Sequence, residues 1–151
     1  MQKIFLLTVI VIFFIPGCGS GSDNEFPPEI TLGQDACNNC FMLINEKRFA
    51  ASVWLENGEA KRFDDIGCML EFIKKNDDRI KSYWVYDYKT KGPVKAETAF
   101  FINSKNIITP MGFGIAAFNS EETAHKFAKQ NNTNVISFKE LKTINLISKM
   151  E

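Results

Sequence analysis

The sequence predicts an α+β domain built from two similar β-β-α-β halves that pack together. Two observations indicate this fold class. Apolar stretches are short and partly alternating, which is typical of strands, and a pair of them is followed by an amphipathic helical stretch. The same order then occurs a second time, displaced by roughly 50 residues. The halves share this pattern with only slight sequence identity.

The first half begins with two predicted strands. Residues 49–55 are apolar and partly alternating, which indicates a strand. Asn57-Gly58 is a strong signal for a tight two-residue turn, because both residue types tolerate a positive φ. Residues 59–63 are therefore expected to return antiparallel to the first strand.

A helix and a third strand complete the first half. Asp64 or Asp65 can cap the helix through a side-chain oxygen, and the helix is expected to stop near Asn76. One helix face carries the apolar residues Ile66, Met69, Leu70 and Ile73. Residues 83–86 are aromatic and β-branched, so they predict a strand.

The second half is expected to follow a connection at residues 89–95. Residues 98–102 predict a strand, residues 103–106 a polar turn and residues 107–109 a second strand. In this arrangement a glycine-rich motif at residues 111–114 lies at the junction between the strand pair and the next helix.

A second helix and a last strand complete the domain. Asn119 or Ser120 can cap the helix, and Glu122 is placed to complete a capping box. The apolar stripe of this helix consists of Ala124, Phe127 and Ala128. Residues 135–138 predict the final strand.

The N-terminus has the pattern of an export signal. Lys3 precedes an almost unbroken apolar run at residues 4–15, which is too short to span a bilayer comfortably and fits a signal-peptide core. A small residue and then Cys18 follow the run, which resembles a bacterial lipobox. We therefore expect a lipoprotein signal peptide at residues 1–17, lipidation of Cys18, and a flexible tether at residues 18–28 that is rich in Gly, Ser and Pro.

Length and charge leave one ordinary domain after this tether. We place it at residues 29–151, with its halves at about 37–88 and 96–140. Lysine plus arginine equals aspartate plus glutamate, so the formal net charge is zero and no basic patch indicates a nucleic-acid partner. No nucleophile–base pair, phosphate-binding glycine loop or dinucleotide fingerprint is present. The sequence therefore predicts a protein that is not an enzyme.

Three cysteines remain once Cys18 is assigned to the lipid anchor, and they are Cys37, Cys40 and Cys68. An odd number argues against a complete disulfide framework in an exported protein. The asparagines between Cys37 and Cys40 favour a turn, and a turn allows both sulfurs to face one point. This pair can clamp one metal ion or form one reversible disulfide.

Two methionines stand in the same motifs as candidate functional residues. Met42 follows the cysteine pair, and Met111 lies between Pro110 and Gly112, outside any helical stripe. Thiolate and thioether sulfur are the soft ligands that select Cu(I) over hard cations. Junction loops often display functional groups, and residues 63–68, which end in Cys68, form such a junction in the first half.

Four motifs together resemble the NosL family, the lipoprotein copper chaperones associated with nitrous oxide reductase. The motifs fall in the family's order and spacing, cover essentially the whole exported region, and occupy residues 35–42, 63–70, 109–118 and 138–141. The family commonly has glycine where Phe41 stands in this chain. The resemblance implies two β-β-α-β halves, in agreement with the pattern of strands and helices.

The resemblance also implies a function. It implies binding of one Cu(I) and delivery of that ion to nitrous oxide reductase or to its membrane copper-transfer assembly factors. Cys37, Cys40 and Met111 would be the ligands, with Met42 and Cys68 as further candidates. The lipid anchor would hold the protein on a membrane of the cell envelope, facing the periplasm, and the outer membrane is favoured in a Gram-negative host.

Two other functions are compatible with the same residues. A thiol–disulfide redox lipoprotein would use Cys37 and Cys40, but such a pair normally opens a helix, and this one precedes a strand. Structural zinc usually needs four ligands, and nothing in the spacing of the three cysteines and His125 suggests that they converge. His125 is expected to be a solvated surface residue, Cys68 can be a buried residue of its helix, and Met42 can pack under the first strand.

Overall fold

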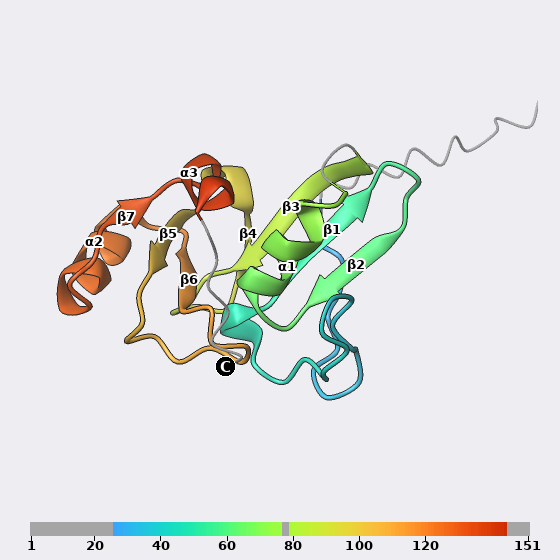
Figure 1. Ribbon diagram of the computed structural model, residues 1–151, viewed down its shortest axis with the longest axis horizontal. Coiled ribbons are helices and arrows are strands. Elements are labelled where there is room, and N and C mark those ends of the chain that lie inside the picture. The colour runs from blue at the N-terminus through green and yellow to red at the C-terminus, as the bar shows by residue number, and fades with distance from the viewer. Residues whose placement is uncertain (1–25, 77–78, 145–151) are drawn as a thin grey trace, which may run out of the picture.

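Two antiparallel sheets, each accompanied by helices, make up the computed structural model of this chain, which describes residues 26–76 and 79–144 (Figure 1). The predicted signal peptide at residues 1–17 and the predicted lipid site Cys18 lie outside the described residues. Within the described ranges, no helix is both long and apolar enough to cross a membrane.

The first sheet has the strand order β2-β1-β3-β4, with every neighbouring pair antiparallel. A short 3-10 helix, η1 (Lys47–Phe49), leads into the central strand. The strands are β1 (Ala51–Leu55), β2 (Ala60–Phe63), β3 (Ile80–Tyr86) and β4 (Pro93–Lys95). The predicted hairpin is confirmed, and its turn has Gly58 at φ +83°, where a residue without Cβ is favoured.

Helix α1 (Ile66–Ile73) packs against β1 and β2 and also touches β6 of the second sheet. Of the two capping candidates, Asp65 is the N-cap: its side chain accepts a hydrogen bond from the Gly67 amide at 2.9 Å. The predicted apolar face is confirmed, because Ile66, Met69, Leu70 and Ile73 are all buried. The start of α1, next to β2, is therefore held by the buried carboxylate of Asp65.

The second sheet has the strand order β6-β5-β7. It follows the 3-10 helix η3 (Ala96–Thr98), and its strands are β5 (Phe100–Asn103), β6 (Ile115–Phe118) and β7 (Val135–Ile136). In both sheets the first strand in sequence is central, the second lies on one side of it, and the strand after the helix lies on the other. The predicted fold class, two β-β-α-β halves, is confirmed by this shared topology.

Helix α2 (Glu121–Gln130) packs against all three strands of the second sheet. Its N-cap is Ser120, whose hydroxyl accepts from the Thr123 amide, so the predicted capping box with Glu122 is wrong by one position. Ala124 and Ala128 form the buried side of the helix.

Helix α3 (Phe138–Thr143) follows β7. The last strand was predicted at residues 135–138, but it ends at Ile136, and Phe138 belongs to the helix. Ser137 and Glu140 form a complete capping box at its start, so Phe138 begins a helix although it is aromatic. Phe138 and Leu141 are buried in the main core.

Two further predictions in the second half are wrong. Residues 107–109 form no strand, and Ile108 is 90% exposed there. The second strand is Ile115–Phe118, which the sequence signals only weakly because two of its four residues are alanine, a weak strand former. Residues 111–114 therefore connect β5 to β6 and do not form a strand-to-helix junction. The predicted connection at residues 89–95 contains the strand β4.

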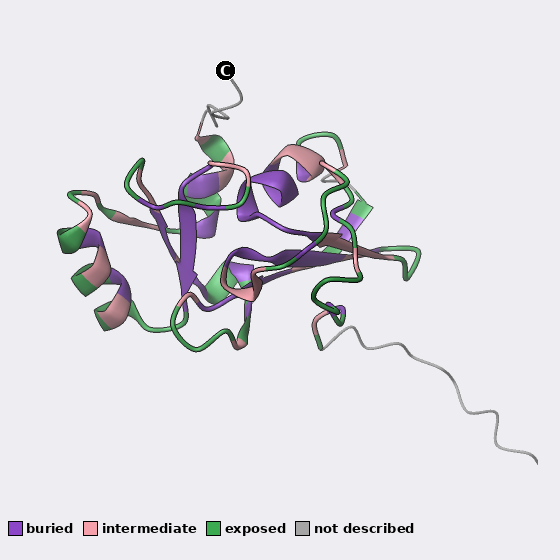
Figure 2. Cartoon of the chain, turned by 90° about the horizontal axis from the view of Figure 1, so that it is seen from below, coloured by how far each residue is buried: buried purple, intermediate pink, exposed green. Residues whose placement is uncertain are grey.

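The main hydrophobic core runs through both halves. Its buried members include Val53 of β1, Phe101 of β5 and Ile115 of β6. Figure 2 shows β6 buried along its length, and α2 buried on one side only. The sheets are joined where Asp87 forms a parallel bridge with Ala117, so the end of β3 continues onto the edge of β6. This junction fixes the two halves relative to each other.

Candidate metal centre

The segment that carries Cys37 and Cys40 forms a tight turn around the Cys37 sulfur. The amides of Asn39 and Cys40 both donate to Cys37 Sγ, each at 3.5 Å. The Phe41 amide donates to the Cys37 carbonyl at 3.0 Å, and the Cys37 amide donates to the Met42 carbonyl at 2.8 Å. These contacts place two backbone donors at one sulfur and favour its negative charge.

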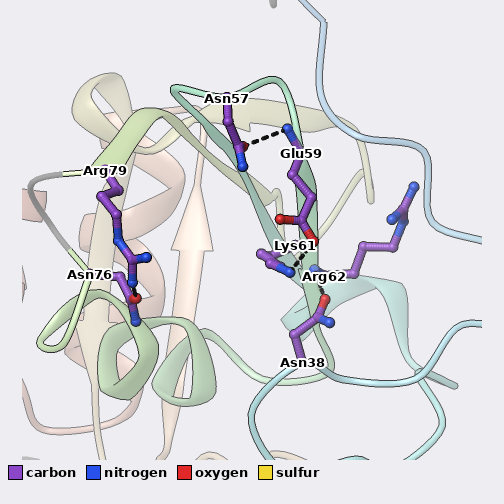
Figure 3. A network of polar contacts seen from close by, with 7 residues as sticks. All are labelled: Asn38, Asn57, Glu59, Lys61, Arg62, Asn76 and Arg79. Carbon is purple, nitrogen blue, oxygen red and sulfur yellow. Dashed lines mark hydrogen bonds and ion pairs between the residues drawn. The ribbon is translucent and has the colours of Figure 1, made fainter.

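The two asparagines between the cysteines anchor this turn to two other elements. Asn38 exchanges a pair of hydrogen bonds with the main chain of Arg62 on β2, at 2.8 and 2.7 Å. Figure 3 shows the second of them, which the Arg62 amide donates to the Asn38 side chain. The Asn39 amide group donates to the Glu71 carboxylate of α1 at 2.7 Å. The turn is therefore docked between β2 and α1, and the asparagines do more than favour a turn.

Asp64, Asp65 and Cys68 lie where β2 leads into α1. Asp64 is 2% exposed and Cys68 is 1% exposed. Cys68 belongs to the first turn of the helix that Asp65 caps. Because the turn at Cys37 is docked against the same helix, the thiols of both segments meet.

The ligand atoms of Cys37, Cys40, Asp64 and Cys68 all lie within 4.8 Å of one another. The Cys40 thiol donates to Asp64 Oδ1 at 3.3 Å, and all three cysteines are free thiols. The spacing in sequence gives no sign of convergence, but the three cysteines converge in the structure, without His125. They converge because the hairpin of β1 and β2 brings the start of α1 back beside the segment that precedes β1.

The three thiols differ in acidity. Hydrogen bonding from Cys68, with help from backbone amides, lowers the pKa of Cys37 to about 6 against the opposing effect of burial. Burial is the main cause that raises the pKa of Cys40 to about 12. The hydrogen bond to Cys37, together with burial, raises the pKa of Cys68 well above its ordinary value. At neutral pH the cluster therefore holds one thiolate, that of Cys37, beside two protonated thiols.

The loop between β5 and β6 lies across the N-terminus of α1. The Thr109 hydroxyl donates to Asp65 Oδ2 at 2.6 Å, and the Met111 amide donates to the same oxygen at 3.0 Å. Phe113 packs so closely on Gly67 that a Cβ at Gly67 would lie 2.0 Å from the ring. Met111 is half-buried against the main core. The structure thus brings the Met111 loop to the helix end that carries Cys68.

The remaining candidates are placed differently. The Met42 residue is 59% exposed, so the alternative that it packs under the first strand is wrong. Phe41, at the position where glycine was expected, has φ +63° and is 80% exposed. His125 lies on α2 with an exposed side chain, its Nε2 is 3.7 Å from the Glu121 carboxyl group, and it is not part of the cluster, which confirms the predicted surface position.

A sequence model of the NosL family matches residues 29–145, which is most of the chain. The chain belongs to the NosL family. Among solved structures it is similar to the crystal structure of the copper chaperone NosL from Shewanella denitrificans, with a TM-score of 0.64 and 19% sequence identity. The match covers 83% of this chain and 100% of that one. No curated protein sequence matches the chain.

In this member of the NosL family, the geometry also bears on the redox alternative. A reactive thiol needs both a low pKa and access to its partner. Here the thiol of low pKa is Cys37, which is 1% exposed, whereas the more accessible Cys40 has a raised pKa. No helix begins at Cys40. The pair is therefore better arranged to hold a cation than to attack a disulfide.

In this NosL-family chain the sequence does not predict Asp64 as a site residue, and it predicts Cys68 only as a further candidate. Their pattern, a cysteine one helical turn after a carboxylate pair, is also the pattern of an ordinary capped helix. The odd number of cysteines was the one sequence signal for a three-thiol site.

Proposed function

We propose that this protein is a membrane-tethered metallochaperone that binds Cu(I) and delivers it for the maturation of nitrous oxide reductase. The observation that carries the proposal is the convergence of Cys37, Cys40 and Cys68 at one point. Three thiols in a cluster without histidine provide the soft ligands that Cu(I) prefers. Membership of the NosL family and the fold shared with a copper chaperone support the same cargo.

The proposed ligands are Cys37, Cys40 and Met111, now with Cys68 as a stronger candidate than Met42. Cys37 and Cys40 face one point together with Cys68, while Met42 points its side chain into solvent. Met111 sits on the loop that is hydrogen-bonded to the start of α1. Thioether sulfur adds affinity for Cu(I) while leaving the charge of the site unchanged.

Release of the ion also fits the arrangement of these side chains. Cys37 and Cys68 are buried, whereas Cys40 is half-buried and is followed by the exposed residues Phe41 and Met42. A partner can therefore approach from the Cys40 side. There it would replace one sulfur ligand at a time, so that the ion need not pass through water.

The proposed location is the cell envelope, with the lipid anchor at Cys18 and the domain facing the periplasm. In a Gram-negative host we place the anchor in the outer membrane. The test is metabolic labelling with an alkyne fatty acid, followed by membrane fractionation of the unaltered chain and of Cys18→Ala. Label on the unaltered chain and none on Cys18→Ala is the expected result; equal labelling of both would contradict it.

The metal preference is tested by anaerobic titration of the reduced chain from Asp23 onward, followed by native mass spectrometry. We expect one Cu(I) per chain, bound far more tightly than Zn(II). Stoichiometric zinc that survives an excess of Cu(I) would contradict the proposed cargo. Apo and loaded protein should show the same far-UV circular dichroism, because the cluster is formed by the fold itself.

Delivery is tested in a deletion strain grown on nitrate with limiting copper. The strain should accumulate nitrous oxide, and the unaltered gene should restore its reduction. A gene encoding Cys37→Ser should fail to restore it although the protein is present at a normal level. Normal nitrous oxide reduction by the deletion strain at every copper concentration would refute the proposed delivery.

A further inference from the structure

One carboxylate, that of Asp65, joins the start of α1 to the loop that carries Met111. Its Oδ1 accepts from the Gly67 amide and so caps the helix that carries Cys68. Its Oδ2 accepts from the Thr109 hydroxyl and the Met111 amide, 44 and 46 positions away. The side chain is fully buried, so these donors are its neighbours in place of water.

Helix capping alone does not explain why the residue is aspartate. Serine, threonine or asparagine caps a helix about as well. Serine and threonine are too short to reach a second segment as well as their own helix, and asparagine would turn an N–H group toward one of the donors. Only a carboxylate presents two oxygens that both accept.

We propose that Asp65 is a positioning residue that holds Met111 in place as a ligand for Cu(I). The inference rests on the proposed function and adds a residue that touches no metal. By fixing the backbone at Gly67 and at Met111 with one rigid group, Asp65 sets the distance between the Cys68 thiol and the Met111 loop. Gly67 supports the arrangement, because any side chain there would push Phe113 and its loop away.

Thr109→Val is the sharpest probe, since it keeps the shape of the side chain and removes the hydroxyl that donates to Asp65 and accepts from the Gly114 amide. We expect the affinity for Cu(I), measured anaerobically by competition with a chromophoric chelator, to fall by about 10-fold. Asp65→Asn should reduce it at least as much. Thr109→Ser retains the hydroxyl and should restore the affinity of the unaltered protein.

A double-mutant cycle separates positioning from a general loss of structure. In a Met111→Leu background, Thr109→Val should cause no further loss of Cu(I) affinity, because the ligand that it positions is gone. A second readout is the ¹³C-labelled Met111 methyl resonance. Its shift on addition of Cu(I) should be large in the unaltered protein and small in Thr109→Val.

Asp87→Asn is the matched control, because Asp87 is also a buried aspartate that accepts several hydrogen bonds, from Lys89, Thr90 and Asn119. It should lower stability and leave Cu(I) affinity and the methyl shift unchanged. The inference would be overturned if Thr109→Val lowered Cu(I) affinity equally in the unaltered protein and in Met111→Leu. It would also be overturned if the Cu(I)-induced shift of the Met111 methyl resonance were the same in Thr109→Val as in the unaltered protein. Cu(I) binding that survives Met111→Leu intact would overturn it and leave the proposed function standing, whereas no Cu(I) binding by the unaltered protein would overturn both.

Discussion

Cys40 donates its thiol hydrogen to Asp64, with 3.3 Å between Sγ and Oδ1 across 24 positions of sequence. This contact ties the turn before β1 to the start of α1. It also adds a carboxylate oxygen to the three sulfurs of the cluster. A closed zinc site uses four ligands. Whether Asp64 is needed for binding should therefore distinguish Zn(II) from Cu(I) at this cluster.

Asp64→Asn should therefore distinguish copper from zinc. Asparagine keeps the size of the side chain and an oxygen that can accept from Cys40, but it removes the negative charge. We expect Zn(II) affinity to fall by about 10-fold or more, while Cu(I) affinity changes little, because Cu(I) is held by soft sulfur. Competition titrations with both metals measure the two effects. A comparable loss for Cu(I) would show that the carboxylate belongs to the copper site.

Substitution of each cysteine by serine should test the number of thiolate ligands. Cys37→Ser and Cys40→Ser should each weaken Cu(I) binding strongly, and Cys68→Ser should do so to a similar degree because its sulfur lies in the same cluster. Urea unfolding of the metal-free variants provides the control for stability. If Cys68→Ser binds Cu(I) as tightly as the unaltered chain, Cys68 is a buried core residue only.

The dependence of Cu(I) affinity on pH should report the same ligand number independently. Near pH 7.5, Cys37 is already a thiolate because its pKa is about 6, whereas Cys40, with a pKa of about 12, and Cys68 are protonated. Each protonated thiol that binds must release its proton, so affinity rises with pH. Between pH 7 and 8 we expect about two protons released per Cu(I) if both bind, and about one if Cys68 does not. Below pH 6 the slope should steepen, since Cys37 must then lose its proton too. A Cu(I) affinity independent of pH would contradict thiolate ligation.

Phe41→Gly should stabilise the metal-free protein. Phe41 has φ +63°, a conformation that costs an L-residue about 1 kcal/mol and that glycine adopts freely. The ring is 80% exposed, so little packing is lost with it. The control is Phe41→Ala, which removes the ring and keeps the Cβ that causes the strain. Urea midpoints that are equal for the two variants would show that the backbone there is unstrained.

Asp87→Asn should weaken the junction between the two sheets. Asp87 Oδ2 accepts from the Asn119 amide at 2.8 Å, while Oδ1 accepts from Lys89 and Thr90. We expect a loss of about 2 kcal/mol in the free energy of unfolding at pH 7, because asparagine places an N–H group against one of these donors.

The loss of stability caused by Asp87→Asn should depend on pH. Burial alone would raise the pKa of Asp87, but hydrogen bonds from the Thr90 and Asn119 amides and from neighbouring groups outweigh it and hold the pKa below its ordinary value. The ionised carboxylate therefore stabilises the fold fully above the unfolded-state pKa, and this stabilisation is lost as pH falls through the lowered value. The difference in the free energy of unfolding between the unaltered protein and Asp87→Asn should be constant above about pH 5 and should shrink in acid. A difference that grows in acid would contradict this account.

Local signals were sufficient for the first half of the fold. The Asn57-Gly58 turn, the apolar face of α1 and the strand at Tyr86 were each predicted from neighbouring residues, because turn geometry and side-chain period act over a few positions. In the second half the same reasoning failed at Ile115–Phe118. Its alanines favour a strand weakly, and burial against the rest of the core decides their conformation.

The sequence by itself determined the repeat of two halves, the cysteine pair in a turn, and the motifs that resemble the NosL family. Only the tertiary structure decided that Cys68 and Asp64 join that pair, and that the Met111 loop is held by Asp65. These residues are separated by 24 to 46 positions. The physical reason is that a thiol, a carboxylate and a loop amide carry no local pattern that reveals their partners. Those partners are set when the hairpin folds back and the second sheet packs against α1.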